Sequence, residues 1–143
     1  MAIVKRSFRL TTSDSARVEA VRDRWPRANA SEVLRAAIAW FGHKGQFTAQ
    51  SFADVSDALA VELAKDDVKI SGMTLPDDEA EALDMLVAKR PPGTYRRFSR
   101  TELVRIALFV FSRVDDEELQ AARDGIRRLV PGPKKEDAID INR

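Results

Sequence analysis

Two short stretches of the chain alternate apolar and polar residues in the way that predicts a half-buried β-strand. In the first, Phe8 and Leu10 are separated by a polar residue, and in the second Met73 and Leu75 hold the same places. The stretches span residues 4–10 and 68–75. Because side chains of a strand point alternately to its two faces, these apolar residues are expected to face inward and the residues between them outward.

A helix with an apolar stripe is predicted directly after each strand. The first begins at Ser13 or Asp14, whose side chains are good helix caps, and stops at Pro26. The second begins near Pro76 or Asp77, and the sequence Arg-Pro-Pro-Gly at residues 90–93 ends it. The two stripes consist of Val18, Val21 and Trp25 and of Ala80, Leu83, Leu86 and Val87.

A further helix in each half carries the clearest internal repeat. Residues 29–41 (NASEVLRAAIAWF) align without a gap with residues 99–111 (SRTELVRIALFVF), and the match keeps the chemistry at nearly every position. Arg35 falls on Arg105 in this alignment. The chain therefore contains the order strand, helix, turn, helix twice.

The remaining segments are predicted to connect and extend these two units. A loop at residues 42–45 leads into a helical stretch whose apolar positions are three or four apart, and a last helix is expected over residues 115–130. The inward positions of these two helices are Phe52, Val55, Leu59 and Leu63, and Leu119, Ile126 and Leu129. Pro131 ends the last helix, and residues 131–143 are expected to form a flexible tail.

Composition narrows the class of protein. The chain of 143 residues contains no Cys, which excludes disulfides, thiolate zinc sites and Cys nucleophiles. It shows no apolar run of bilayer length, no signal-peptide pattern, no phosphate-binding Gly loop and no catalytic triad. His43, the only histidine, is expected to be solvated. We therefore expect a cytoplasmic protein that is not an enzyme and that needs no metal or other cofactor.

The formal net charge of +1 hides a segregation of charge along the chain. Residues 1–44 carry nine Lys+Arg and four Asp+Glu, residues 45–89 carry three against ten, and residues 90–143 carry twelve against nine, which gives +5, −7 and +3. A partner feels the local field rather than the sum. The first and last thirds are thus able to present a basic surface, although solvated helix faces would give the same counts.

The strand, followed by two helices of which the second opens Ser/Thr-Glu-x-x-Arg-x-Ala, resembles the ribbon-helix-helix family of DNA-binding proteins, the Arc and MetJ type. The resemblance covers residues 3–41 and 68–111, roughly half of the chain. One such unit cannot close a core or satisfy the edge of its strand, so family members intertwine as dimers. Here the partner unit is present in the same chain, and the two strands are expected to pair with each other.

The expected fold is mainly α with one short two-stranded antiparallel β-ribbon. Two tandem ribbon-helix-helix units would form an intramolecular pseudo-dimer, accompanied by a connector helix and a C-terminal helix. Residues 1–130 would constitute a single pseudo-symmetric domain. Its parts are the first unit (3–41), the connector (42–67), the second unit (68–111) and the C-terminal helix (115–130).

The outward residues of the ribbon are the expected base readers, because a two-stranded ribbon fits the major groove of DNA. In the first strand these are Lys5, Ser7 and Arg9, and the resemblance assigns base reading to the same positions. In the second strand the outward positions include Gly72 and Thr74, together with Ile70, which would touch a thymine methyl group at most. Either the second strand reads DNA weakly or through apolar contact, or the second unit is a scaffold that completes the fold.

The N-termini of the second helices are the expected anchors for DNA phosphates, since their free N–H groups and dipole favour anions. The expected phosphate-contacting residues are Arg27, Asn29 and Ser31 in the first unit and Arg96, Arg97, Ser99, Arg100 and Thr101 in the second. Simple N-capping by Ser31 and Thr101 is the alternative. Arg35 and Arg105 are expected to support the packed two-fold region or an ion pair rather than to reach DNA.

The expected function is sequence-specific binding of double-stranded DNA, in the role of a transcriptional repressor or regulator. A second interpretation is an accessory protein of a plasmid or mobile-element conjugative transfer complex, where tandem units of this family occur. A third is an antitoxin-like module that binds a protein partner through the connector or the C-terminal helix. Assembly with further copies along DNA is compatible with each, and a helix-turn-helix fold is the structural alternative if residues 4–10 form no strand.

Overall fold

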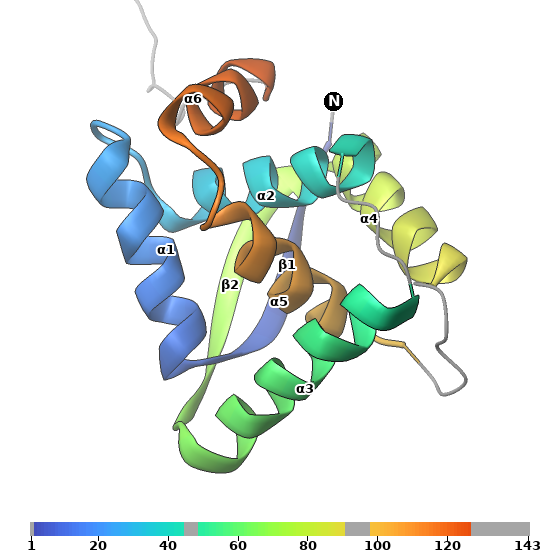
Figure 1. The fold of residues 1–143 in the computed structure, drawn as a ribbon. Helices are drawn as coiled ribbons and strands as arrows, with labels where there is room; N and C mark the ends of the chain where they lie inside the picture. Colours follow the sequence, from blue (N-terminus) through green and yellow to red (C-terminus); the bar gives the residue numbers. More distant parts are fainter. Residues whose placement is uncertain (1, 45–48, 91–97, 127–143) are drawn as a thin grey trace, which may run out of the picture.

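The computed structural model describes residues 2–44, 49–90 and 98–126, which form six helices and two strands (Figure 1). The elements follow one another in the order strand, helix, helix, helix, strand, helix, helix, helix. They are β1 (Ile3–Thr11), α1 (Thr12–Arg24), α2 (Ala30–Lys44), α3 (Ala49–Lys65), β2 (Val68–Pro76), α4 (Asp77–Lys89), α5 (Arg100–Phe111) and α6 (Asp116–Gly125). No helix of this described part is both long and apolar enough to cross a membrane.

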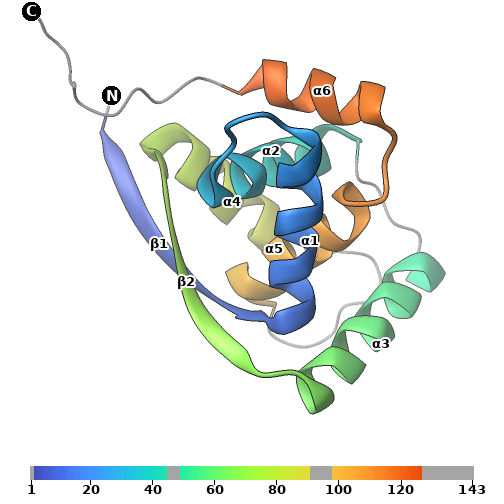
Figure 2. The same cartoon turned by 90° about the vertical axis from the view of Figure 1, so that its left-hand side faces the viewer.

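The two strands pair with each other in antiparallel orientation, as the sequence predicts. Ser7 lies opposite Gly72, Lys5 opposite Thr74, and the pairing extends over all nine residues of each strand. Each strand buries the alternate apolar residues that the pattern indicates, namely Phe8, Leu10, Met73 and Leu75. Figure 2 shows that the helices lie on one side of this ribbon, so its outward face is left uncovered by them.

The two halves of the chain are intertwined. We use first half for β1, α1 and α2 and second half for β2, α4 and α5. Helix α2 of the first half packs against β2, α5 of the second half packs against β1, and the two helices pack extensively against each other at the centre. Both helices bury a nearly continuous run of residues, Val33–Ile38 in α2 and Leu103–Leu108 in α5. Neither half therefore encloses a core without the other.

The first helix of each half begins directly after its strand. Helix α1 is capped by Thr11, whose hydroxyl accepts a hydrogen bond from the backbone N–H of Asp14, while the Asp14 carboxylate accepts one from the backbone N–H of Thr11. The predicted start at Ser13 or Asp14 is therefore wrong, because this reciprocal capping box places Asp14 in the first turn. The predicted start of α4 at Asp77 is confirmed.

Three boundaries or positions differ from the sequence prediction. Gly42, His43 and Lys44, expected in a loop, continue helix α2, whose last turn lies beside Leu86 of α4. Helix α6 ends at Gly125 instead of residue 130, since glycine destabilises a helix interior; Leu129 and residues 131–143 lie outside the described residues. Leu63, expected inward, is 53% exposed.

The connector and C-terminal helices cover the central pair from two sides. Helix α3 packs against α5, with Phe52 and Leu59 buried as predicted. Helix α6 packs against α2, where the indole of Trp40 donates a hydrogen bond to Glu118 and Arg123 pairs with Glu32. The predicted inward residue Leu119 of α6 is buried. Each half thus receives one additional helix, attached through different contacts.

Candidate nucleic-acid interface

The outward face of the ribbon gathers the residues predicted to read bases. Lys5, Ser7 and Arg9 are exposed on β1, and Gly72 and Thr74 are exposed on β2. The outward positions of the two strands carry the basic residues Lys5 and Arg9 and no acidic residue. A solvent-exposed face with only positive charges is attractive to a polyanion.

The register makes the two ends of this face chemically different. Arg9 lies opposite Ile70 at one end, and Lys5 lies opposite Thr74 at the other, with Ser7 and Gly72 between them. Ile70 is 77% exposed, which is unusual for an isoleucine on a regular strand. The period of two predicts this outward position of Ile70, where only apolar contact, as with a thymine methyl group, is open to its side chain.

The N-termini of the central helices flank the ribbon. In α2, Asn29 is the cap, because its side-chain oxygen accepts from the backbone N–H of Glu32. The hydroxyl of Ser31 accepts a hydrogen bond from the backbone N–H of Thr74 at 3.4 Å. The start of α2 therefore lies beside the C-terminal part of β2. The alternative interpretation of Ser31 as the cap is therefore wrong: this residue lies within the first turn.

Helix α5 begins in the same way. Ser99 caps it in a capping box with Glu102, so Thr101, the alternative cap, lies in the first turn as well. Both helix starts thus present a polar cap and a half-buried hydroxyl two residues later. These are the places where free backbone N–H groups are available to an anion.

The predicted phosphate-binding arginines differ in their surroundings. Arg27 is exposed in the turn before α2, where its φ of 62° lies in the left-handed region. Arg100 instead pairs with Asp84 of α4, and Arg6 of β1 approaches the same carboxylate at 4.0 Å. The hydrogen bond from Arg100 lowers the pKa of Asp84 below its usual range. Arg96 and Arg97 lie outside the described residues.

Arg35 and Arg105 do not reach the ribbon face but join the two halves, as expected. Arg35 forms a bidentate ion pair with Glu79 of the second half, with N–O distances of 2.8 and 2.7 Å. Arg105 pairs with Asp14 of the first half at 2.6 Å. Both arginine side chains are buried. Each half thus inserts its arginine onto the first-turn acid of the other half.

The connector helix is attached to only one of these two ion pairs. Glu62 of α3 pairs with Arg105 at 3.2 Å and also with Arg17 of α1. At the end of α3, Asp66 accepts hydrogen bonds from the hydroxyl and the backbone N–H of Ser13, and these lower the pKa of Asp66. Sequence reasoning missed Glu62, because nothing in the pattern indicated which half the connector would cover.

Comparisons with known proteins do not identify a family for this fold and interface. No family model, no curated protein and no solved structure matches the chain.

Proposed function

We propose that this chain binds double-stranded DNA in a sequence-specific manner, as a tandem ribbon-helix-helix pseudo-dimer that inserts its ribbon into the major groove. The observation that carries the proposal is the ribbon face itself. It is bare of helices, free of acidic residues, and presents Arg9 and Lys5 beside small residues at Ser7 and Gly72. A two-stranded ribbon of this kind matches the width of the major groove.

The proposed contacts are of two kinds: contacts to phosphates, which position the protein on DNA, and contacts to bases, which read the sequence. The starts of α2 and α5, with Asn29 and Ser99 as caps, would hold phosphates on either side of the groove. Arg9 would read guanine O6 and N7 with its fork, while Lys5 and Thr74 would contact the opposite end of the site. Binding of this kind, without any reaction, fits the role of a transcriptional repressor or regulator.

The direct test is selection of bound duplexes from a random DNA pool by the purified protein. We expect a short enriched motif with a guanine at one end and no exact two-fold symmetry, because the two ends of the ribbon face carry different residues. Recovery of a motif would support sequence-specific binding. A pool that remains random, together with no retention of DNA at low salt, would refute the proposal.

A separate prediction concerns the phosphate anchor Arg27. Arg27→Gly is expected to weaken binding to all duplexes and to reduce the slope of log K against log salt concentration by about 0.9, the value for one lost phosphate contact. The free energy of unfolding should stay within about 1 kcal/mol of the parent, because glycine relieves the left-handed strain but gains entropy when unfolded.

The matched control is Arg113→Ala, which removes the same charge just beyond the far end of α5, where Arg113 stacks on Phe109. Its salt slope should equal that of the parent protein. If both variants lowered the slope equally, net charge and not a contact of Arg27 would explain the effect.

A further inference from the structure

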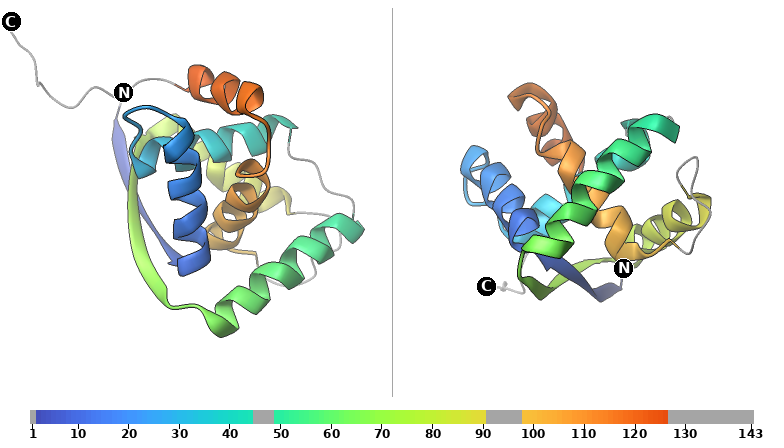
Figure 3. Two further views of the ribbon diagram at one scale, coloured as in Figure 1. Left: turned by 60° about the vertical axis from the view of Figure 1, so that its left-hand side comes forward. Right: turned by 60° about the horizontal axis from the view of Figure 1, so that its bottom comes forward.

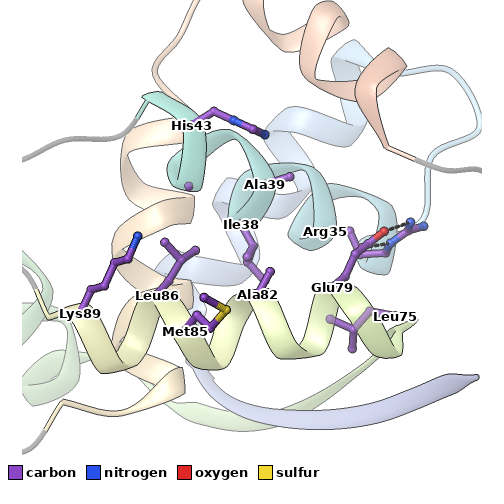
Figure 4. Close-up of a pocket in the computed structure, with 11 residues that line it drawn as sticks. Arg35, Ile38, Ala39, His43, Leu75, Glu79, Ala82, Met85, Leu86 and Lys89 are labelled. Carbon is purple, nitrogen blue, oxygen red and sulfur yellow. Dashed lines mark hydrogen bonds and ion pairs between the residues drawn. The ribbon is translucent and has the colours of Figure 1, made fainter.

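An apolar groove lies between α2 and α4, away from the residues proposed to contact DNA (Figure 4). Its volume is about 300 Å³. Figure 4 shows Ala82 and Leu86 pointing from α4 toward α2, and Met85, next to them, is 60% exposed. The apolar lining includes Ile38, Ala39, Gly42, Ala82, Met85 and Leu86. Lys89 lines the end of the groove near the C-terminus of α4.

The groove is open because small residues replace large ones of the other half. Ala39 of α2 corresponds to Phe109 of α5, and Ala82 of α4 corresponds to Arg17 of α1. Between α5 and α1 the ring of Phe109 lies near the guanidinium groups of Arg17 and Arg113, at 4.8 and 3.8 Å from the ring centre. Between α5 and α1, these large side chains thus fill the space that stays open between α2 and α4.

Helix α3 covers the filled space between α5 and α1. Glu62 of α3 contacts both Arg17 and Arg105, and Arg105 also donates a hydrogen bond to the backbone oxygen of Leu59. Figure 3 shows α3 lying across α5, on a different side of the molecule from α6. In that half, a helix of the chain therefore packs beside the region equivalent to the groove. On the groove side, Met85 of α4 is accessible to solvent.

The outer face of α3 is itself apolar at its C-terminal end. Opposite the buried side of an ordinary surface helix, polar residues are expected. Here the exposed positions Ala60, Val61 and Ala64 form a small apolar surface, with Val61 53% exposed, and Asp57 precedes them by one turn. The helix therefore has a second face that is suited to packing.

We propose that the outer face of α3 docks into the α2/α4 groove of a second copy of this chain. Antiparallel packing brings three pairs together at the same spacing: Asp57 with Lys89, Val61 with Met85, and Ala64 with Ala82. The small side chains allow close approach of the helices, and the charged pair fixes their direction. Because groove and helix face are different surfaces, the contact is head-to-tail and leaves one of each free for a further copy.

Two single variants test the contact, each altering one exposed side chain. In sedimentation experiments, the average mass of the parent protein should rise with concentration up to about 1 mM, as expected for a small interface. The mass should continue to rise beyond that of a dimer. Met85→Glu blocks the groove and Val61→Glu blocks the helix face, so each alone should remain monomeric. Their equimolar mixture should form a heterodimer and nothing larger, because only one intact groove meets one intact helix face.

The charged pair provides an independent check of direction. Lys89→Asp and Asp57→Lys should each weaken self-association at least several-fold, and the double variant should recover it. Unchanged thermal unfolding of all variants shows that the folds are intact. A parent protein that stays monomeric over the whole range would overturn the proposal, as would a mixture of the Met85 and Val61 variants that forms no heterodimer.

Discussion

Replacing Asp14 with alanine is expected to lower the free energy of unfolding by about 3–5 kcal/mol, the range for removing one partner of a buried ion pair. The Asp14 side chain has no exposed surface, and its carboxylate accepts hydrogen bonds from Thr11, Arg17 and Arg105. Its loss removes the carboxylate half of the capping box of α1 and leaves the buried Arg105 with less compensation. Urea-induced unfolding followed by circular dichroism gives the value.

Asp84→Ala is the matched control, because Asp84 also pairs with an arginine of α5 but is 40% exposed. Its expected loss is below about 1 kcal/mol, as for other solvent-screened pairs. Asp14→Asn separates the two roles of Asp14: it keeps the shape of the cap and removes the charge. If the Asp14 and Asp84 alanine variants lost equally little stability, the ion pair between the halves would not be a major source of it.

Arg9→Ala is expected to weaken binding to the preferred DNA site by about 1–3 kcal/mol, the range for one bidentate contact to a base. Arg9 is exposed on the outward face of β1, and its guanidinium is the one planar fork among the exposed outward residues of the ribbon. Binding to scrambled duplexes should fall much less. Titrations of both duplexes at one fixed salt concentration compare the two effects.

Thr74→Ala serves as the control for Arg9, because both occupy the last outward position before the buried leucine of their strand. A single hydroxyl contributes less than a bidentate fork, so its loss should have a smaller effect. An equal decrease for specific and scrambled DNA on loss of Arg9 would identify it as a phosphate contact. The proposed reading face would then be wrong.

The faces of the strands and their mutual pairing were predictable from local patterns. The period of two at Phe8 and Leu10, repeated at Met73 and Leu75, determines which side is buried, and the distance of 65 residues between equivalent positions agrees with the pairing of Ser7 with Gly72. Helix starts were less predictable. Several capping residues stand next to one another at each start, and the choice depends on the carboxylate three residues further on, as Thr11 and Asp14 show.

The ion pairs between the halves required the three-dimensional fold. Arg35 and Arg105 are equivalent in the repeat, and so are Asp14 and Glu79, so a signal was present in the sequence. Only the packing of α2 on β2 and of α5 on β1 shows that these residues meet crosswise. No repeat indicated where α3 would pack, because the connector segment occurs only once in the chain.

The intertwining of the halves also determines when the protein can fold during its synthesis. Strand β1 leaves the ribosome before its partner β2, with three helices made between them, and the helix that covers β1 is complete only at Phe111. The core therefore closes only after these later elements have been made. Until then, the unpaired backbone edge of β1 is available to pair with other chains. Aggregation is therefore a greater risk during synthesis than after the core has closed.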